Sequence, residues 1–374
     1  MTTPARIQLR AAPLRGAVLA GILLAGALLS GCPSATQAPI RVSVRNGQAA
    51  TPPQPGQIEE LARAEGEMSW YTSVPEAEAN QILAGFMKKY PFLRAHVVRG
   101  GSFTIADQVT GEIASGKLQA DVLHVLDPSI FVQLRGQGAL LYYDCPESHV
   151  FPTEYKDPGY WTALRAVTLC LAYDPRRVKS PRVPAHWEDL LGASWQGRVG
   201  VKDTQTAGSG YAFYYLLRER YGTMFWERMA ARHPKVYQTS KQMLAGLNGG
   251  EVDAVAGMLD YSAYGAIQAH QSLKLVWPVE GTPLVLGPVA ILAGAPHPNA
   301  GRLFLDYILS APGQQLMIAA LGGYSVRPGV KPPAGQTPLA KLHPLTPTAG
   351  WSDYAAKLDQ VQKEGSELLG TGTE

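Results

Sequence analysis

Strand-like and helix-like patterns alternate along most of the chain. Short, largely apolar runs such as Val122–Val125 and Val167–Tyr173 are typical of buried strands, whereas the apolar positions of Val74–Lys89 recur at helical spacing. Strands that alternate with helices of about 10–15 residues predict α/β layers around a parallel sheet. The other expected strands are Met68–Tyr71, Ala95–Val98, Arg198–Val201, Ala254–Ala256, Leu275–Val279 and Val289–Leu292, and the other expected helices are Glu59–Glu65, Ile105–Ser115, Pro128–Gln137, Trp187–Leu191, Ser209–Tyr221, Lys241–Asn248, Asn299–Leu309 and Gly313–Leu321.

The first 32 residues follow a different pattern. Arginines at positions 6, 10 and 15 precede the apolar run Gly16–Leu29, which ends in small residues before Cys32. This order is typical of a secretory signal, and the run is short of the roughly 20 apolar residues that span a bilayer. The string LSGC resembles the lipobox of bacterial lipoproteins, which implies that Cys32 carries lipid and becomes the first mature residue. An ordinary cleaved signal peptide with an incidental cysteine is the alternative.

The signal peptide, residues 1–31, changes the charge of the mature chain. The whole sequence has 33 basic and 30 acidic side chains, and removing the three arginines of the signal leaves 30 of each. A balanced chain has no basic field for nucleic acid, so membrane attachment would come from lipid. Residues 32–57 are rich in Pro, Ser, Thr, Gln and Ala and predict a flexible spacer. We therefore expect an extracytoplasmic protein that lipid anchors to a bacterial membrane, at the periplasm or cell surface.

Two cysteines, Cys145 and Cys170, lie beyond the lipobox. In a compartment that permits disulfides, a bridge between them would close a loop of about 25 residues and contribute about 3 kcal/mol. The alternative is that Cys170, which lies within an apolar run, is a buried small hydrophobe. The sequence leaves both open. No Cys-x-x-Cys motif or Cys/His cluster accompanies the pair, so we do not expect a metal site there.

Seven strings over about residues 66–330 carry a family resemblance. They are SWYTSVPEAEANQILAGF, ADVLHVLDPSIFVQL, KDPGYWTALRAVTLCLAYDP, HWEDLLGASWQGRVGVKDTQTAGSGYAF, GEVDAVAGMLDYSAY, EGTPLVLGPVAILAGAPHPNAGRLFLDYILSAPGQ and GGYSVRP. In this order they resemble the extracellular solute-binding proteins of bacterial ABC importers, in the iron(III)-type group. The resemblance implies a two-lobed type II periplasmic-binding-protein fold with hinge strands, a ligand in the cleft and no cofactor. It also implies a monomer whose partners are an ABC permease and, through it, its ATPase.

The expected hinge strands divide the body into lobes. We place the crossings at Val167–Tyr173 and Val289–Leu292. Lobe one then comprises residues 66–165 with 290–330, and lobe two comprises residues 166–289 with 331–370.

Four strand-to-helix junctions could form a ligand site. In open α/β sheets, ligands lie beyond the carboxyl ends of the strands, where helix N-termini point backbone N–H groups at them. Hydroxyl side chains and glycines at such points suit a carboxylate, phosphate or phosphonate, whereas ordinary helix capping is the alternative. The candidates are Tyr71, Thr72 and Ser73 at the first junction, Gly101 and Ser102 at the second, Thr206, Ser209, Gly210 and Tyr211 at the third, and Ser240 at the fourth.

Further candidates bear on whether the ligand is an organic solute or Fe(III). Ferric-binding relatives hold Fe(III) with two adjacent tyrosines, and here Asp260 and Tyr261 stand at those positions, with Tyr264 close by in the sequence. Arg165 stands where iron-binding relatives tend to have a small residue. Unless it is a surface or paired arginine, it would repel a metal ion but bind a carboxylate or phosphoryl group through parallel hydrogen bonds. We interpret Arg165, Asp260 and Tyr261 as contacts of an anionic or zwitterionic organic solute, with Fe(III) on Asp260, Tyr261 and Tyr264 as the alternative.

Catalytic motifs are missing from the sequence. It contains no Gly-x-Ser-x-Gly elbow, no Walker-type phosphate loop and no His-Glu-x-x-His helix. We therefore expect a binding protein rather than an enzyme. A sensor that presents its ligand to a receptor instead of a permease is the alternative from another class.

Overall fold

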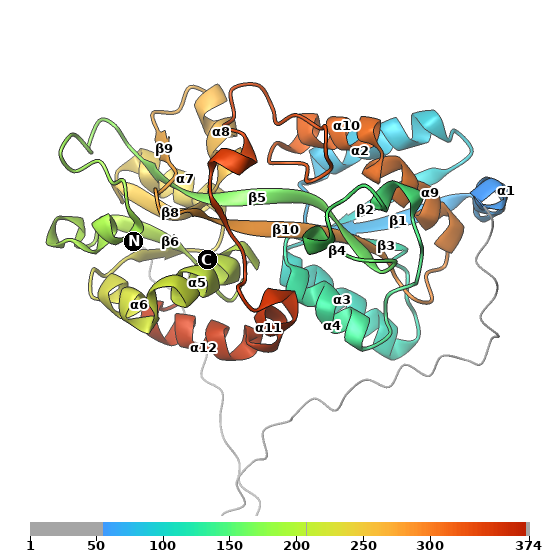
Figure 1. Cartoon of the computed structure of the whole chain (residues 1–374), viewed down its shortest axis with the longest axis horizontal. Helices are drawn as coiled ribbons and strands as arrows, with labels where there is room; N and C mark the ends of the chain where they lie inside the picture. Colours follow the sequence, from blue (N-terminus) through green and yellow to red (C-terminus); the bar gives the residue numbers. More distant parts are fainter. Residues whose placement is uncertain (1–54, 207, 372–374) are drawn as a thin grey trace, which may run out of the picture. The chain divides into compact units, whose positions relative to one another are not determined.

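The computed structural model describes residues 55–206 and 208–371 (Figure 1). The predicted signal peptide, the lipidated Cys32 and the spacer up to residue 54 lie outside these residues. None of the described helices combines the length and the apolar character that a membrane crossing needs.

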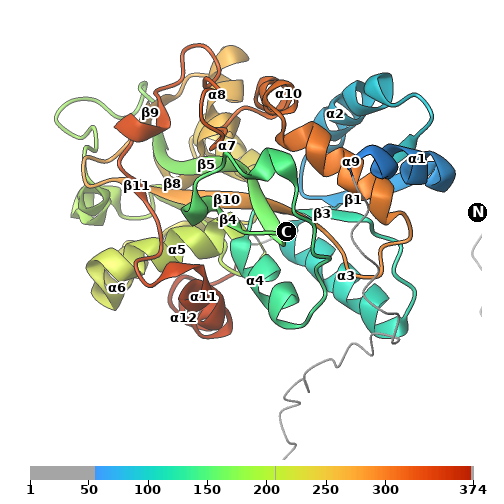
Figure 2. The same cartoon turned by 45° about the vertical axis from the view of Figure 1, so that its right-hand side comes forward.

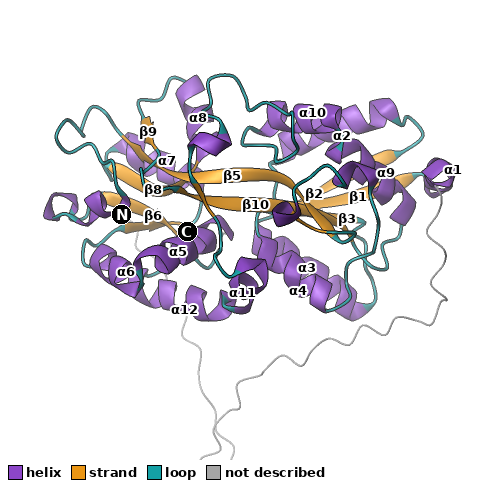
Figure 3. Ribbon diagram, viewed as in Figure 1, coloured by secondary structure: helices purple, strands orange, loops and turns teal. Residues whose placement is uncertain are grey.

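One mixed sheet runs through the described body, and helices cover both of its faces (Figures 1 and 3). The strands are β1 (Glu67–Thr72), β2 (Arg94–Arg99), β3 (Val122–His124), β4 (Lys156–Asp157), β5 (Trp161–Tyr173), β6 (Val199–Lys202), β7 (Lys235–Tyr237), β8 (Ala254–Leu259), β9 (Lys274–Val276), β10 (Thr282–Ile291) and β11 (Pro344–Leu345). The helices are α1 (Pro55–Glu65), α2 (Glu76–Lys89), α3 (Ser102–Ser115), α4 (Pro128–Gly136), α5 (Gly208–Tyr221), α6 (Thr223–Ala230), α7 (Ser240–Gly249), α8 (Asp260–Gln268), α9 (Pro298–Leu309), α10 (Ala311–Leu321), α11 (Gly350–Ala356) and α12 (Leu358–Leu369).

The sheet order β2-β1-β3-β10-β5-β8-β6-β7 separates two lobes. In the first lobe β1 pairs in parallel with β2 and β3, and in the second lobe β6 pairs in parallel with β7 and β8. The antiparallel strands β5 and β10 join the lobes (Figure 3). This arrangement confirms the expected two-lobed α/β fold with hinge strands, while the residue boundaries that we gave the lobes stay a prediction.

Both crossing strands begin earlier in the chain than the sequence pattern indicated. β5 begins at Trp161 rather than Val167, and all thirteen of its residues are buried. β10 begins at Thr282 rather than Val289, and its pairing with β5 shifts register between Gly287 and Pro288. The polar residues of β5 and the Gly-Pro pair of β10 interrupt the apolar runs. The hydrophobic pattern therefore predicted both strands to be shorter than they are.

Each lobe has an apolar core on either face of its part of the sheet. In the first lobe, α2, α9 and α10 pack on one face, and α3 and α4 pack on the other (Figures 1 and 2). In the second lobe, α7 and α8 lie on one face, and α5, α6 and α12 lie on the other. The predicted segment Trp187–Leu191 is a 3₁₀ helix, whereas α6, α8, α11 and α12 were not predicted.

The C-terminal segment contacts both lobes. α11 packs against α4 of the first lobe, and α12 packs against α5 and α6 of the second. Trp351, on α11, contacts apolar clusters of both lobes. The last helices therefore contact both lobes, and the assignment of residues 331–370 to the second lobe stays a prediction.

The two cysteines are free, so the disulfide that the sequence left open is absent from the described residues. Cys145 lies in a first-lobe core, where its Sγ donates to Asp306 Oδ1 at 3.1 Å. Cys170 lies in a second-lobe core and donates to the Met258 carbonyl at 3.4 Å. Each thiol is buried in a different lobe, and Cys170 is the small buried hydrophobe of the alternative interpretation.

Candidate functional site

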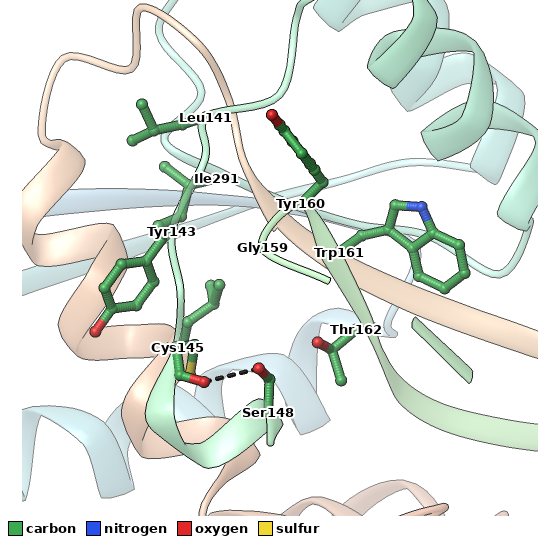
Figure 4. Close-up of a pocket in the computed structure, with 10 residues that line it drawn as sticks. Leu141, Tyr143, Cys145, Ser148, Gly159, Tyr160, Trp161, Thr162 and Ile291 are labelled. Atoms are coloured by element: carbon green, nitrogen blue, oxygen red, sulfur yellow. Dashed lines mark hydrogen bonds between the residues drawn. The ribbon is translucent and has the colours of Figure 1, made fainter. Parts of the chain in front are cut away.

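Two cavities of the described body differ greatly in size. The one beside Cys145 has a volume of about 10 Å³ and is lined by residues such as Tyr143, Ser148 and Trp161 (Figure 4). It has room for about one water molecule. The second, about 680 Å³, lies where residues of the two lobes meet, and it is large enough for a small solute.

Loops and helix starts form the walls of this larger cavity. The first lobe contributes Ser73, Pro75, Arg99, Gly100, Gly101, Ser102, Thr104 and Leu126, and the second lobe contributes Lys202, Thr206, Gly208, Ser209, Gln238, Thr239, Ser240, Lys241, Leu259, Tyr261 and Ser262. Helices α3, α5 and α7 all begin within this lining. The first N–H groups of a helix have no partner within the helix and favour an anion.

The charge of the lining has one sign. Within residues 55–206 and 208–371, three basic side chains, Arg99, Lys202 and Lys241, line the cavity and no acidic side chain does. Arg99 and Lys241 are exposed, whereas Lys202 is only 3 % exposed. Together with the helix starts, these cations give the cavity the chemistry of an anion site.

Lys202 is the central cation of the site, and the sequence analysis missed it. It ends β6, and its Nζ donates to Ser240 Oγ at 2.9 Å and to Ser209 Oγ at 3.3 Å. Burial lowers the pKa of Lys202 to about 7, because a desolvated ammonium favours its neutral form. An anion in the cavity would oppose this effect. Its position at the carboxyl end of a strand was the signal in the sequence that could have identified it.

The structure brings seven of the predicted site residues together at this cavity. They are Ser73, Gly101, Ser102, Thr206, Ser209, Ser240 and Tyr261. Ser73 Oγ also accepts a hydrogen bond from the Leu126 N–H at 3.2 Å, so it supports the neighbouring wall. At the start of α7, Thr239 and Gln242 form a capping box, so the capping alternative accounts for part of that junction.

Four other predicted residues are absent from this lining. Tyr71 donates to Glu112 Oε1 at 2.9 Å, and Thr72 Oγ1 accepts from the Val74 N–H at 3.1 Å. Tyr211 is buried and donates to the Tyr354 carbonyl. A Cβ at Gly210 would lie 1.9 Å from the Asp203 carbonyl oxygen, so this glycine permits close packing of the helix on its strand. All four serve the local structure in this conformation.

Arg165 and Asp260 are also absent from the lining, and both are fully buried. Asp260 Oδ2 accepts from Thr168 Oγ1 at 2.8 Å, and Oδ1 accepts from the Tyr261 N–H at 2.7 Å. Burial raises the pKa of Asp260 to about 6. The Arg165 guanidinium carbon lies 5.0 Å from the centre of the Tyr261 ring. These two groups therefore lie behind the cavity wall.

The three residues considered for Fe(III) do not meet at the cavity. Tyr261 lines it, whereas Asp260 is bonded as above and the Tyr264 ring lies 6.0 Å from that of Trp277. Among the described residues no group of three or more His, Cys, Asp or Glu side chains is placed to hold a metal ion.

Two α/β lobes, two hinge strands and an interlobe cavity define the class of solute-binding proteins. Residues 125–342, more than half of the chain, match the family model described as bacterial extracellular solute-binding protein. The chain belongs to this family, as the sequence motifs indicated, and its role is to bind a solute outside the cytoplasm.

Curated relatives cover most of the chain. An "Uncharacterized protein" of Haemophilus influenzae is 27 % identical over 271 residues, which are 68 % of this chain and 76 % of that protein. A "Putative 2-aminoethylphosphonate-binding periplasmic protein" of Salmonella typhimurium is 21 % identical over 312 residues, 79 % of this chain and 86 % of that protein.

Solved structures share the fold. Iron-bound HitA from Pseudomonas aeruginosa has a TM-score of 0.72 at 21 % identity, covering 80 % of this chain and 99 % of its own. AfuA from Actinobacillus pleuropneumoniae with bound fructose-6-phosphate has a TM-score of 0.72 at 20 % identity, covering 81 % and 98 %. At this identity the two structures establish the fold and leave the ligand open.

Proposed function

We propose that this protein is the solute-binding component of an ABC importer and that its solute is a small organic molecule with a phosphonate or phosphate group. The observation that carries the proposal is the buried Lys202, held between Ser209 and Ser240 at the starts of two helices. A tetrahedral anion with three oxygens can accept hydrogen bonds from several directions at once, which suits helix starts that converge from both lobes.

The names of relatives support the same class of solute. The Salmonella relative is named for 2-aminoethylphosphonate, and AfuA is described with fructose-6-phosphate. HitA is described with iron, so Fe(III) remains the alternative solute. In this chain Fe(III) would meet Lys202, Arg99 and Lys241 in a lining without carboxylates, and cations repel it. We therefore favour the organic anion.

Closure of the lobes is the working step of the proposed mechanism. Ser102 belongs to the first lobe, and Ser209 and Lys202 belong to the second. A solute that touches both sets binds the closed state better than the open state and shifts the population by that difference. The closed protein then docks on the permease, and the importer's ATPase drives uptake. The protein acts as a monomer and leaves the solute chemically unchanged.

Attachment to the membrane completes the proposal. Residues 1–31 would be removed, lipid on Cys32 would hold the protein at the membrane, and the spacer would set its reach. Mass spectrometry of the membrane-extracted protein tests this part, because a mature N-terminus at Cys32 with added acyl mass is expected. An unmodified N-terminus at another residue would contradict it.

Calorimetric titration of the purified protein tests the choice of solute. The probes are methylphosphonate, 2-aminoethylphosphonate, inorganic phosphate, acetate and Fe(III) citrate. We expect at least one phosphonate or phosphate probe to bind at least tenfold more tightly than acetate, about 1.4 kcal/mol, and X-ray scattering to show compaction with that probe. Binding of Fe(III) alone, or of none of the phosphorus compounds, would overturn the proposed solute class.

A further inference from the structure

A buried cation without a hydrogen-bond partner lies behind the cavity wall. Arg165 is on β5 opposite Gly287 of β10, and its side chain is fully buried. Its Nε, Nη1 and Nη2 have no hydrogen-bond acceptor among the described residues. A buried charge without hydrogen bonds is costly, so a group that satisfies it contributes strongly to binding.

Two residues connect this guanidinium to the solute cavity. Tyr261 lines the cavity, and its ring centre lies 5.0 Å from the Arg165 guanidinium carbon. Leu126 also lines the cavity and packs close to Arg165 at Gly287, where a Cβ would lie 2.6 Å from His124 Cε1, 3.0 Å from Leu126 Cδ2 and 3.5 Å from Arg165 Cγ. Tyr261 and Leu126 therefore lie between the Arg165 side chain and the cavity.

The other ionisable groups near Arg165 do not neutralise it by contact. His124 Nδ1 lies 2.8 Å from the Pro288 carbonyl and must donate to it, which leaves Nε2 as an acceptor without a partner. Burial and the Arg165 charge lower the pKa of His124 to about 3, so this ring is neutral. The Asp260 oxygens accept bonds from Thr168 and the Tyr261 N–H and make no ion pair with Arg165 within 4 Å.

We propose that Arg165 is a second anion anchor, which receives a carboxylate of the bound solute once the Tyr261 ring turns aside. A carboxylate fits because its two oxygens lie in one plane and match the guanidinium fork, and because its single charge balances one arginine. The phosphoryl group stays at Lys202, where several donors converge. This inference rests on the proposed function and narrows it to phosphonates or phosphates that also carry a carboxylate.

Matched probes test this second anchor by calorimetry on the full protein. Methylphosphonate has no carboxylate, whereas phosphonoacetate, 3-phosphonopropionate and 4-phosphonobutyrate carry one at increasing distance. We expect one of these three to bind at least about 30-fold more tightly than methylphosphonate, roughly 2 kcal/mol. In Arg165→Met this preference should fall to within about threefold.

Two further measurements keep the test decisive. Arg165→Lys keeps the positive charge but lacks the paired N–H groups of the guanidinium, so it should lose most of the preference for phosphonocarboxylates over methylphosphonate. If Arg165→Met does not fold, the same titrations are made on Arg165→Lys. The ligand-free Arg165→Met protein should melt at the wild-type temperature or above, because a costly buried charge is gone. A preference that persists in both variants, or no preference in the wild type, would overturn the second anchor.

Succinate and glutarate separate this inference from the proposed function. If methylphosphonate does not bind but a dicarboxylate binds in an Arg165-dependent way, the phosphonate function fails and the carboxylate anchor stands. If methylphosphonate binds and no phosphonocarboxylate binds more tightly, the anchor fails and the proposed function stands. If no probe binds, both are wrong.

Discussion

The first lobe faces the cavity with hydroxyl groups, glycine backbone and the exposed Arg99, whereas the second lobe presents Lys202, a cation buried between two serines. A buried, hydrogen-bonded cation is already positioned and screened from salt, while an exposed one is not. From this difference we predict that the second lobe supplies most of the affinity. We expect the first lobe to supply contacts that form on closure and to determine which solutes close the protein.

Loss of the second-lobe cation is the largest effect that we predict. Lys202→Met should weaken binding of the best phosphonate or phosphate probe by about 100-fold, or about 3 kcal/mol, because two helix starts keep their N–H groups but lose the ammonium. Calorimetric titration measures the change. Lys274→Met, an exposed lysine on β9, is the matched control and should bind as the wild type does. Equal affinities in the two variants would remove Lys202 from the site.

Binding by the second lobe should depend on pH above neutrality. Burial lowers the pKa of Lys202 from 10.5 to about 7, so the ligand-free protein has largely lost this proton by pH 8. Anion binding must then restore the proton, and the Kd should rise up to about tenfold per pH unit between pH 7.5 and 9. The unfolded chain keeps this proton up to the ordinary lysine pKa of 10.5, so between pH 7 and 10.5 the unfolded state binds more protons than the folded state. The free energy of unfolding of the ligand-free protein should therefore rise with pH over this range. Subtracting the profile of Lys202→Met isolates the lysine from the titration of the probe itself. If log Kd has the same slope against pH in the wild type and in Lys202→Met, Lys202 is not the group that makes binding depend on pH.

Contact between the lobes can be disturbed without touching the cation. A Cβ at Gly208 would lie 2.6 Å from the Leu126 carbonyl oxygen and 2.8 Å from Asp127 Cβ, so Gly208→Ala should hold the lobes slightly apart. We expect about tenfold weaker binding and less compaction in X-ray scattering with solute. Gly111→Ala, on α3 with nothing within 4 Å of the added methyl group, is the control and should be neutral or mildly stabilising. Full compaction in Gly208→Ala would show that this approach does not limit closure.

Removing one serine hydroxyl from each lobe in turn should change the affinity least. The two variants compare directly how much each lobe contributes to binding. Ser240→Ala removes the closer partner of Lys202 Nζ and should weaken binding about fivefold, because the ammonium loses a bond that positions it. Ser102→Ala in the first lobe should cost about two- to threefold. Parallel titrations of both variants with the same probe measure the ratio. A larger loss for Ser102→Ala would reverse the assignment of affinity to the second lobe.

Sequence reasoning anticipated part of the cavity lining where it relied on the ends of strands. Helix starts after parallel strands must converge at one edge of a sheet, so Ser102, Ser209 and Ser240 were found without any coordinates. Tyr211 does not line the cavity in the structure, because the spacing of residues along a helix does not determine which face is turned towards the cavity. Its position within the first turn of α5 directs the side chain towards the C-terminal segment, which the periodicity had not predicted to be helical.

Charged residues were the other source of error. Lysine side chains are usually exposed, so the position of Lys202 directly after a predicted strand was not used as a signal, yet it is the most buried cation of the lining. Arg165 interrupts the apolar run of β5 and shortened the predicted strand, although the strand continues through it fully buried. Hydrophobic patterns identify where a core lies, but they do not show which charged side chains a fold buries.

The C-terminal helices have a mechanical consequence. α11 is packed on α4 and α12 on α5 and α6, and Gln362 Nε2 donates to the Thr204 carbonyl beside the cavity loop that carries Thr206. The molecule therefore has a third connection besides its two hinge strands, and parting of the lobes must stretch or slide this tether. The length and packing of this C-terminal segment therefore limit how far the two lobes can separate. A fusion partner attached after α12 would act directly on the segment that must move when the lobes separate.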